Sequence, residues 1–416
     1  MQIVLKRPLK SQAVSGEFMQ RSPLQTRSKT YKPTVLDLFC GAGGMSLGFQ
    51  NAGCQILGGI DINPHAIRTH HRNFPDSIVK LPASDITRIK PSMLLPEGSI
   101  DILIGAPPCQ VFSVVGIGKM KHLGRNPEDD PRNFLYKRFV DFLHYYRPRF
   151  FVMENVNTLA NKAIFEQIRE DLERGQRGQR RSYPGYDIDY RVLLSADYGV
   201  PQLRKRLFVV GRRKDLDLEF VFPTRKVKQY VSVGQAIGDL PELEPAVIPL
   251  KKKNSGPRQW DTENEQPYLC EPQSRYQRNM RQGINDGQGV LNHICRAHNE
   301  VDLEIFGWMD QGEQYRDLPE EMRRYRNDIF EDKYKRLHWD EPSWTLTAHM
   351  RKDGLAYIHP TQARSISVRE AARLHSFPDR FVFDAPMTFM FELIGNSTSF
   401  YIQRKSLLDF KRLRDG

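Results

Sequence analysis

The chain has 416 residues, of which 39% are hydrophobic and 27% charged, which is ordinary for a globular protein of about two domains. No apolar run approaches the ~18 residues of a membrane span, and the first residues lack the hydrophobic segment of a secretory signal, so membrane and exported proteins are disfavoured. The five cysteines form no Cys-x-x-Cys pair, which argues against a disulfide framework, and the net charge of +12 favours a polyanionic partner.

Residues 1–33 are polar, basic and aperiodic, which predicts a flexible tail. From residue 34 onward, apolar runs alternate with helical patterns. Strands are expected over residues 34–39, 55–61, 100–106, 150–156, 187–196 and 206–213, and helices over residues 43–53, 63–74, 134–148 and 161–175. Asn63 and Pro64 suit the start of the second helix, as its cap and first-turn residue. Strands that alternate with helices predict an α/β fold with a parallel sheet covered on both faces.

After residue 215 this rhythm breaks. Residues 216–383 have scattered prolines, basic runs, isolated aromatic residues and no sustained period, which predicts a second, smaller, loop-rich domain made for contact. Within the first domain, the Arg-rich segment 175–185 (GQRGQRRSYPG) is expected to be an exposed loop between a helix and a strand.

The segment LDLFCGAGGMSLGF (36–49) reads as a strand, a glycine turn and a helix. Its turn glycines let the backbone approach a ligand and present helix N-terminal amides to it: Gly41, Gly43 and Gly44. Ser46 stands where the third glycine of a dinucleotide fingerprint belongs. Asp61 ends the next strand, where a carboxylate can bind both ribose hydroxyls, and Asp85, expected beyond the third strand, could accept from an adenine amino group. Together these residues favour an adenosine-containing cofactor.

A cysteine follows two prolines in GAPPCQVFSVVG (105–116). The prolines fix φ and remove two backbone donors, so the chain that enters Cys109 has few conformations. The cysteine also comes just after an expected strand, where open α/β sheets bind their ligands. This pattern indicates either a reactive thiol or a buried structural cysteine in a stiff loop.

Acidic and basic residues follow at two further strands. Glu154 lies at the end of FVMENV, and acidic residues in apolar runs are seldom buried without a role, although a cap or a structural ion pair is the alternative. In QLRKR, Gln202, Arg204 and Arg206 alternate, so one strand would present them on one face. Two adjacent guanidinium groups repel each other unless they face anions such as phosphate or carboxylate.

The ordered set DLFCGAGG, GAPPCQ, ENV, QLRKR and SISVREAARLHSFPD resembles the DNA (cytosine-5)-methyltransferase family, from about residue 34 to 402. The resemblance implies a Rossmann-like S-adenosylmethionine-dependent methyltransferase sheet over residues 34–215 and a target recognition domain over 216–383. Residues 384–416 would return to the catalytic domain. The implied activity is methylation of carbon 5 of a cytosine in a specific duplex DNA sequence, as in bacterial restriction–modification.

By resemblance, the Cys109 thiolate adds to cytosine carbon 6 and makes carbon 5 nucleophilic. Glu154 would hold and protonate ring nitrogen 3, and Arg206 would lie at the carbonyl oxygen of the base. Arg204 is expected near the nucleophile loop, although either arginine could instead bind phosphate. Because the target must leave the duplex to reach Cys109, base flipping is implied.

The resemblance also assigns cofactor and DNA contacts. Residues expected at S-adenosylmethionine are Phe39, Gly41, Gly43, Asp61, Ile62, Asp85 and Asn396, with Phe39 and Ile62 on the adenine. Ser113 and Gln110 are expected to contact DNA, with Ser113 at a phosphate. We expect a cytoplasmic monomer that binds double-stranded DNA, with no metal and no membrane contact. Any partner restriction endonuclease would act separately.

The last motif departs from the family pattern, which has Gly-Asn and a small residue followed by Val-Pro. Here IGNSTSFYI (394–402) keeps Gly395, Asn396 and Ser397 and loses the Val-Pro, and the basic segment 403–416 that follows is short for the expected helix. This difference concerns the methionine end of the cofactor and the closing of the large domain.

In NHICRAHN (292–299), two histidines and a cysteine lack a nearby fourth ligand, so structural or DNA-facing roles are favoured over zinc.

Three other functions compete with this interpretation. An RNA cytosine-5 methyltransferase could use the same scaffold, but the CFT element typical of that branch is missing. A catalytically silent DNA-binding module would not need Cys109, Glu154 and both arginines. A dehydrogenase with a Rossmann fold is disfavoured by the glycine pattern.

Overall fold

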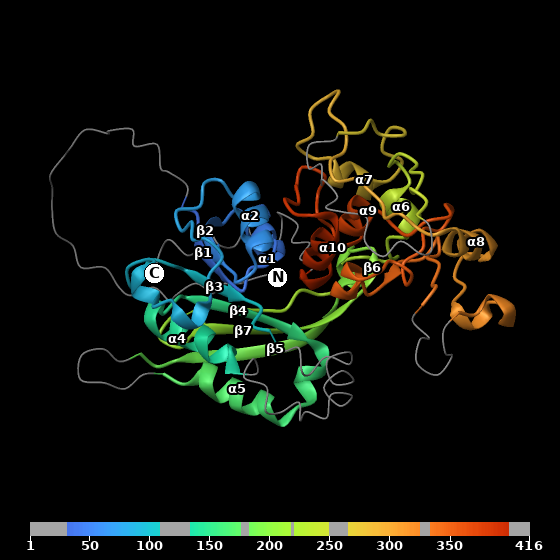
Figure 1. The fold of residues 1–416 in the computed structure, drawn as a ribbon. Coiled ribbons are helices and arrows are strands. Elements are labelled where there is room, and N and C mark those ends of the chain that lie inside the picture. Colours follow the sequence, from blue (N-terminus) through green and yellow to red (C-terminus); the bar gives the residue numbers. More distant parts are fainter. Residues whose placement is uncertain are drawn as a thin grey trace, which may run out of the picture.

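The computed structural model describes residues 31–108, 134–175, 183–217, 220–248, 265–324 and 333–398. A six-stranded sheet of order β2-β1-β3-β4-β7-β5 forms its centre (Figure 1). In that order the strands are Gln55–Ile60, Thr34–Leu38, Ile102–Gly105, Phe150–Val156, Lys205–Arg213 and Tyr186–Leu194. The predicted α/β fold is therefore confirmed.

The sheet is mixed, whereas the sequence pattern predicted a parallel one. Strands β2, β1, β3 and β4 pair in parallel, while β7 is antiparallel to both of its neighbours, β4 and β5. The reason is the short connection from β5 to β7. A parallel crossover needs about a dozen residues or more, usually with a helix, whereas antiparallel neighbours can be joined by a short turn.

Helices and side chains cover both faces of the sheet. The helices of this part are α1 (Gly44–Asn51), α2 (Pro64–Asn73), α4 (Tyr136–Tyr146) and α5 (Ala163–Glu173). As predicted, Asn63 caps α2 by accepting a hydrogen bond from the amide of His65, and Pro64 occupies the first turn. Strand residues alternate between the two faces: Leu103 packs with residues of α4 and α5, and Ile102 packs on the α1 side.

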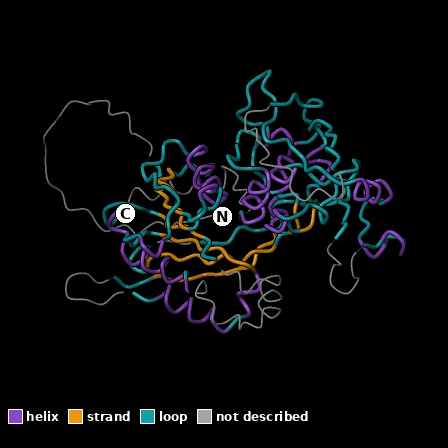
Figure 2. The backbone as a smooth tube through the Cα atoms, in the orientation of Figure 1, coloured by secondary structure: helices purple, strands orange, loops and turns teal. Residues whose placement is uncertain are grey.

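The region after residue 215 is mostly loop, as its sequence indicated (Figure 2). Its regular elements are α6 (Val233–Ile237), α7 (Arg275–Met280), α8 (Glu300–Trp308), the two-residue strand β8 (Ser343–Trp344), α9 (Val368–Leu374) and α10 (Met387–Asn396). Strand β8 pairs in parallel with β6 (Gln202–Leu203). Short 3-10 turns are η1 (Ile86–Arg88), η2 (Pro91–Met93), η6 (Asn157–Asn161), η7 (Ser195–Tyr198), η8 (Tyr315–Asp317), η9 (Glu320–Met322) and η10 (Ala348–Arg351).

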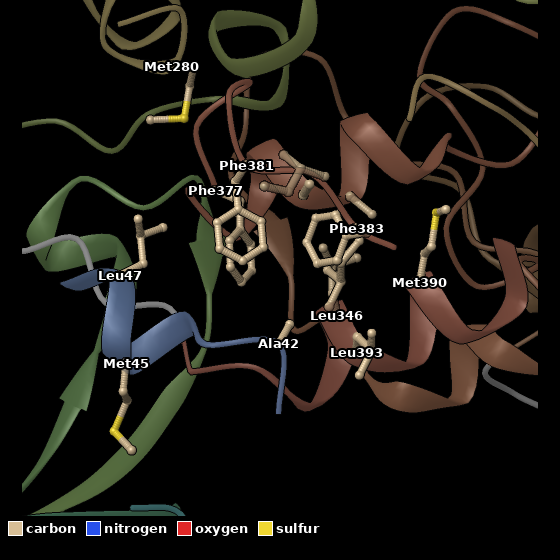
Figure 3. Packing of buried hydrophobic residues seen from close by; sticks show 14 of the residues in the cluster. Ala42, Met45, Leu47, Met280, Leu346, Phe377, Phe381, Phe383, Met390 and Leu393 are labelled. Atoms are coloured by element: carbon tan, nitrogen blue, oxygen red, sulfur yellow. The ribbon is translucent and has the colours of Figure 1, made fainter. Parts of the chain in front are cut away.

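One hydrophobic cluster joins this region to the sheet. Met45 and Leu47 of α1 belong to the same buried cluster as Phe377, Phe381 and residues of α9 and α10 (Figure 3). A separate small cluster holds residues 305–358 together: Ile305, Phe306, Met309, Tyr315, Leu318, Tyr334, Leu355 and Ile358. The second domain proposed over residues 216–383 therefore shares its core with the sheet and has a small core of its own.

Three local expectations have different outcomes. Asp85, expected beyond the third strand, instead precedes it in the connection from β2 to β3, where the chain makes an isolated parallel bridge from Val79 to Gly58. Tyr31 hydrogen-bonds Asp101, so the last residues of the expected tail lie against the sheet. The rest of the tail, most of the Arg-rich loop and the segment 403–416 lie outside the described residues. No helix in the described part of the chain is long and apolar enough to cross a membrane.

Candidate active site

Glu154 lies near the end of β4, and only 6% of its surface is exposed. Nε of Arg206, on the adjacent strand β7, is 3.0 Å from Oε1 of Glu154. The antiparallel register explains this contact, because Arg206 is paired with Val156, two residues beyond Glu154 and on the same face. A structural ion pair was the alternative role that the sequence allowed for Glu154. Such a pair, Glu154 with Arg206, is present and buried at the carboxyl end of β4.

Two opposing effects set the protonation of Glu154. Burial raises its pKa, since a low-dielectric environment disfavours the charged carboxylate. The positive charges of Arg206 and Arg204 lower it, and so do hydrogen bonds from Arg206 and Thr398. Such a balance between desolvation and charge is what a group that exchanges a proton with a substrate requires.

Arg204 is fully enclosed, with 1% of its surface exposed. Its Nη1 donates to the carbonyl of Leu346 at 2.8 Å, and its Nη2 donates to the carbonyls of Gly395 (3.1 Å) and Ser397 (3.0 Å). Burial lowers the pKa of this guanidinium to about 9. In this structure Arg204 joins the sheet to the end of α10.

The expected alternation on one strand is wrong for the QLRKR segment. Gln202 belongs to β6 and pairs with β8, Arg206 belongs to β7 of the main sheet, and Arg204 lies between the two strands. The Gln202 side chain binds the carbonyl of Leu374 and the amide of Leu346. Between Gln202 and Arg206 the chain leaves the small β6–β8 sheet and enters the main sheet. Buried polar side chains need hydrogen-bond partners, and those of Gln202 and Arg204 find them in backbone groups of Leu346 and Leu374, outside the main sheet.

The stretch that leads to Cys109 reaches the same edge of the sheet. Strand β3 ends at Gly105, which is paired with Met153, directly before Glu154. The Asn155 side chain donates to the carbonyl of Pro107 at 3.0 Å, so the residue after Glu154 fixes the proline stretch. Cys109, Gln110 and Ser113 lie outside the described residues.

The glycine turn after β1 contains the candidate cofactor residues. Phe39, Gly41 and Gly43 have positive φ values of 58°, 53° and 97°. A Cβ at Gly43 would approach Phe74 to 2.5 Å, whereas one at Gly41 would meet nothing within 4 Å, so Gly41 borders open space. The Gly41 amide donates to Asp61 Oδ2 at 2.9 Å, which joins the turn to the end of β2.

The other expected cofactor residues differ in exposure and partners. The side chain of Ile62 is 69% exposed beside Asp61. Asp85 is a cap residue, since its Oδ1 accepts from the amide and the hydroxyl of Thr87, and these bonds lower its pKa. Asn396 is exposed at the end of α10.

Sequence reasoning missed a polar cluster beneath the glycine turn. Ser46 Oγ donates to Asp37 Oδ2 at 2.6 Å and lies 3.3 Å from Nε2 of His70, and all three side chains are fully buried. Burial raises the pKa of Asp37 to about 7 and lowers that of His70 to about 3. The rule that singled out Glu154, an acidic residue in an apolar run, would also have found Asp37 in LDLF.

His293 and His298 have structural partners. His293 lies 3.0 Å from Ser367 Oγ and 2.7 Å from the carbonyl of Pro241, and His298 lies 3.1 Å from Ser365 Oγ. Within the described ranges, no group of three or more potential ligands is arranged to hold a metal ion.

Glu154 with Arg206, and the glycine turn with Asp61, therefore lie at the carboxyl ends of the parallel strands. This is the edge of the sheet at which α/β enzymes bind their ligands. The sequence model of the C-5 cytosine-specific DNA methylases matches residues 33–404, and the chain belongs to that family. It is 35% identical over 367 residues to the type II methyltransferase M1.HphI of Haemophilus parahaemolyticus, covering 88% of this chain and 82% of that protein.

Other relatives agree. The type II methyltransferase M.XorII of Xanthomonas oryzae is 35% identical over 391 residues, covering 88% of this chain and 81% of that protein. A solved structure of a putative DNA modification methyltransferase encoded within an Escherichia coli prophage has a TM-score of 0.68 and 27% identity, over 92% of this chain and 99% of that one. The family resemblance stated from the sequence motifs is thus confirmed.

Proposed function

We propose that this protein transfers a methyl group from S-adenosylmethionine to carbon 5 of a cytosine turned out of duplex DNA, as a bacterial type II modification methylase acting in the cytoplasm. The observation that carries the proposal is the buried Glu154–Arg206 pair, whose strand also binds the proline stretch that precedes Cys109. One edge of the sheet would thus present a thiol, an acid and a cation to a single base.

On the base side, Glu154 binds ring nitrogen 3 and supplies its proton, so that negative charge does not accumulate on the ring. Arg206 holds Glu154 and approaches the carbonyl oxygen of the base. The Cys109 thiolate bonds to carbon 6, which makes carbon 5 the nucleophile. After methyl transfer, loss of the carbon 5 proton and of the thiolate restores the aromatic ring.

On the cofactor side, the residues fit an adenosine-containing group. The open space at Gly41 admits a ligand close to the backbone, Asp61 offers its carboxylate to ribose hydroxyls, and the exposed Ile62 offers an apolar face to adenine. Phe39, Gly43, Asp85 and Asn396 complete the proposed pocket. S-adenosylmethionine supplies an electrophilic methyl group when it is bound.

The proposed partner is double-stranded DNA, which the net charge of +12 favours. Residues 34–215 with the C-terminal segment 384–416 form the proposed catalytic domain, and residues 216–383 form the proposed recognition domain. Arg204, which binds carbonyls at residues 346, 395 and 397, connects the two and is a better candidate for holding them together than for binding phosphate. A monomer is proposed, with any restriction endonuclease acting separately.

The proposal is tested by incubating the full chain with radiolabelled S-adenosylmethionine and either unmethylated phage λ DNA or total transfer RNA. Label is expected in DNA, as 5-methylcytosine after nuclease digestion and chromatography. Label confined to RNA, or recovered as N4-methylcytosine, would contradict the proposed activity.

A further inference from the structure

The hydroxyl of Ser46 joins three elements beneath the glycine turn. Ser46 lies in the first turn of α1, and its Oγ donates to Asp37 Oδ2 of β1 at 2.6 Å and lies 3.3 Å from Nε2 of His70 in α2. All three side chains are fully buried. A serine hydroxyl has one hydrogen, so with that hydrogen directed at Asp37 it accepts the Nε2 hydrogen of His70. Burial lowers the pKa of His70 to about 3, which keeps the ring neutral with a single N–H.

Two glycines make room for the His70 ring. A Cβ at Gly59, which is paired with Asp37 across β2 and β1, would lie 2.7 Å from Nε2 of His70. A Cβ at Gly43 would lie 3.0 Å from Cδ2 of His70 and 2.5 Å from Cε2 of Phe74. The glycine turn and β2 therefore both contact the imidazole, and a side chain at either glycine would displace it.

Helix α1 begins without a side-chain cap. Its N-cap residue is Gly43, at φ 97°, which has no side chain to accept hydrogen bonds from the first amides of the helix. A capping side chain normally fixes where a helix begins. At α1 the hydroxyl of Ser46, one turn further on, attaches the helix to β1 and α2 instead.

This attachment bears on two walls of the proposed cofactor pocket. The Gly41 amide donates to Asp61 Oδ2 at 2.9 Å, and the Asn63 amide donates to Asp61 Oδ1 at 2.8 Å. Asn63 caps α2, the helix that carries His70. The carboxylate proposed for the ribose is thus held between the glycine turn, which leads into α1, and the start of α2. A shift of α1 against α2 would separate Gly41 from Asp61.

We propose that Ser46 and His70 are positioning residues for the cofactor, whose hydrogen bond fixes α1 against α2 and so holds the glycine turn and Asp61 at the spacing that binds S-adenosylmethionine. The inference rests on the proposed function, since it refines the cofactor pocket of that reaction. Both side chains lack exposed surface, so they act through the turn and not by touching the cofactor. A third glycine at position 46, as in a dinucleotide fingerprint, could not make this bond.

The test measures the dissociation constant of S-adenosylhomocysteine, the product left after methyl transfer, by isothermal titration calorimetry on the full chain. Ser46→Ala should raise it by about tenfold or more, because Asp37 and His70 both lose a buried partner. The KM for S-adenosylmethionine should rise with it, while kcat falls by no more than about threefold, since the lost interaction is not specific to the transition state.

His70→Phe keeps a ring against Phe74 and removes the nitrogen that bonds to Ser46. It should weaken binding less than Ser46→Ala does, because the Ser46 hydroxyl keeps Asp37. In the double variant, His70→Phe should add no further loss to that of Ser46→Ala, since the bond between the two residues is already gone.

Ser77→Ala is the matched control, because Ser77 is also buried and its hydroxyl donates to the carbonyl of Ile56 at 3.3 Å, near the start of β2 and away from the turn. It should bind S-adenosylhomocysteine as the wild type does. Wild-type affinity in Ser46→Ala, or equal losses in Ser46→Ala and Ser77→Ala, would overturn the inference. Losses that multiply in the double variant would overturn it as well, because the two residues would then act separately.

If Ser46→Ala does not fold, His70→Phe decides by the same titration, and wild-type affinity in that variant would overturn the inference. Wild-type protein that binds no S-adenosylhomocysteine would instead contradict the proposed function itself.

Discussion

Glu154 and Asp37 are both buried carboxyl groups of the sheet, but the groups that surround them differ in charge, and this difference suits them to different roles. Glu154 has cationic partners, so its burial is opposed by charge, and it lies at the edge of the sheet. Asp37 has the Ser46 hydroxyl as its main partner, and Asp61 nearby adds negative charge, so no positive charge in the described part of the chain offsets its burial. The first group suits proton exchange with a base, and the second suits a fixed contact beneath the glycine turn.

Asp37 should make stability depend on pH. Burial raises its pKa to about 7 in the folded protein, well above its value in an unfolded chain, so the folded state keeps a proton that the unfolded state releases above about pH 4. The stabilising contribution is therefore present at low pH and is lost as pH rises towards 7. Asp37→Asn, which cannot ionise, should reduce the fall in melting temperature between pH 5 and pH 8.

Asp85→Asn is the matched control, because Asp85 is partly exposed and its pKa is lowered by the bonds from Thr87. It should leave that fall unchanged or slightly increase it. A melting curve of Asp37→Asn that falls between pH 5 and pH 8 as steeply as the wild type would show that Asp37 does not carry this dependence.

At the scale of elements, helix α9 is held by buried charge. Arg373 bonds to Asp239, next to α6, and to Asp379, and all three side chains are fully buried. Arg364 and Glu370 make a second buried pair, and Arg369 binds three backbone carbonyls. These contacts fix α6 and α9 in register, which hydrophobic packing alone does not specify.

Arg373→Met should destabilise the protein strongly, because it leaves the buried carboxylate of Asp379 without its ion-pair partner and that of Asp239 with Arg281 alone. A loss of about 3–5 kcal/mol in the free energy of unfolding is expected, measured by urea denaturation. Arg351→Ala, which removes the more exposed pair with Glu392, serves as the control and should cost less than ~1 kcal/mol. Equal effects of the two substitutions would contradict the role given to the α9 network.

The predictable elements are those with a clear period or a local cap. The strands of the main sheet, α2 with Asn63 at its cap, and the glycine turn all follow from nearby residues. Strand β8, of two residues, has no period, and the hydrogen bonds from Arg204 to Gly395 and Ser397 join residues 191 and 193 positions apart. Such contacts depend on how the second region packs on the sheet, which local patterns do not encode.

At the scale of the whole molecule, the second region shares a core with the sheet, so the two should act as one body on DNA. The net charge of +12 predicts that binding releases counterions from phosphates. The dissociation constant for a λ DNA fragment should therefore rise steeply between 50 and 200 mM salt, as measured by fluorescence anisotropy. A dissociation constant that is flat over this range would contradict a polyanionic partner.

Covalent bonding of Cys109 to cytosine is the step on which the proposed reaction depends, and trapping of the covalent adduct tests it most directly. Fragments of λ DNA that carry 5-fluorocytosine are incubated with S-adenosylmethionine and protein, and denaturing electrophoresis detects an adduct. Fluorine cannot leave as a cation, so elimination should stall with the thioether intact. Wild type and Cys40→Ala should form the adduct, since the Cys40 thiol is buried and its pKa is raised, whereas Cys109→Ala should form none. An adduct with Cys109→Ala, or loss of the adduct only in a folded Cys40→Ala variant, would contradict the assignment of Cys109 as the nucleophile.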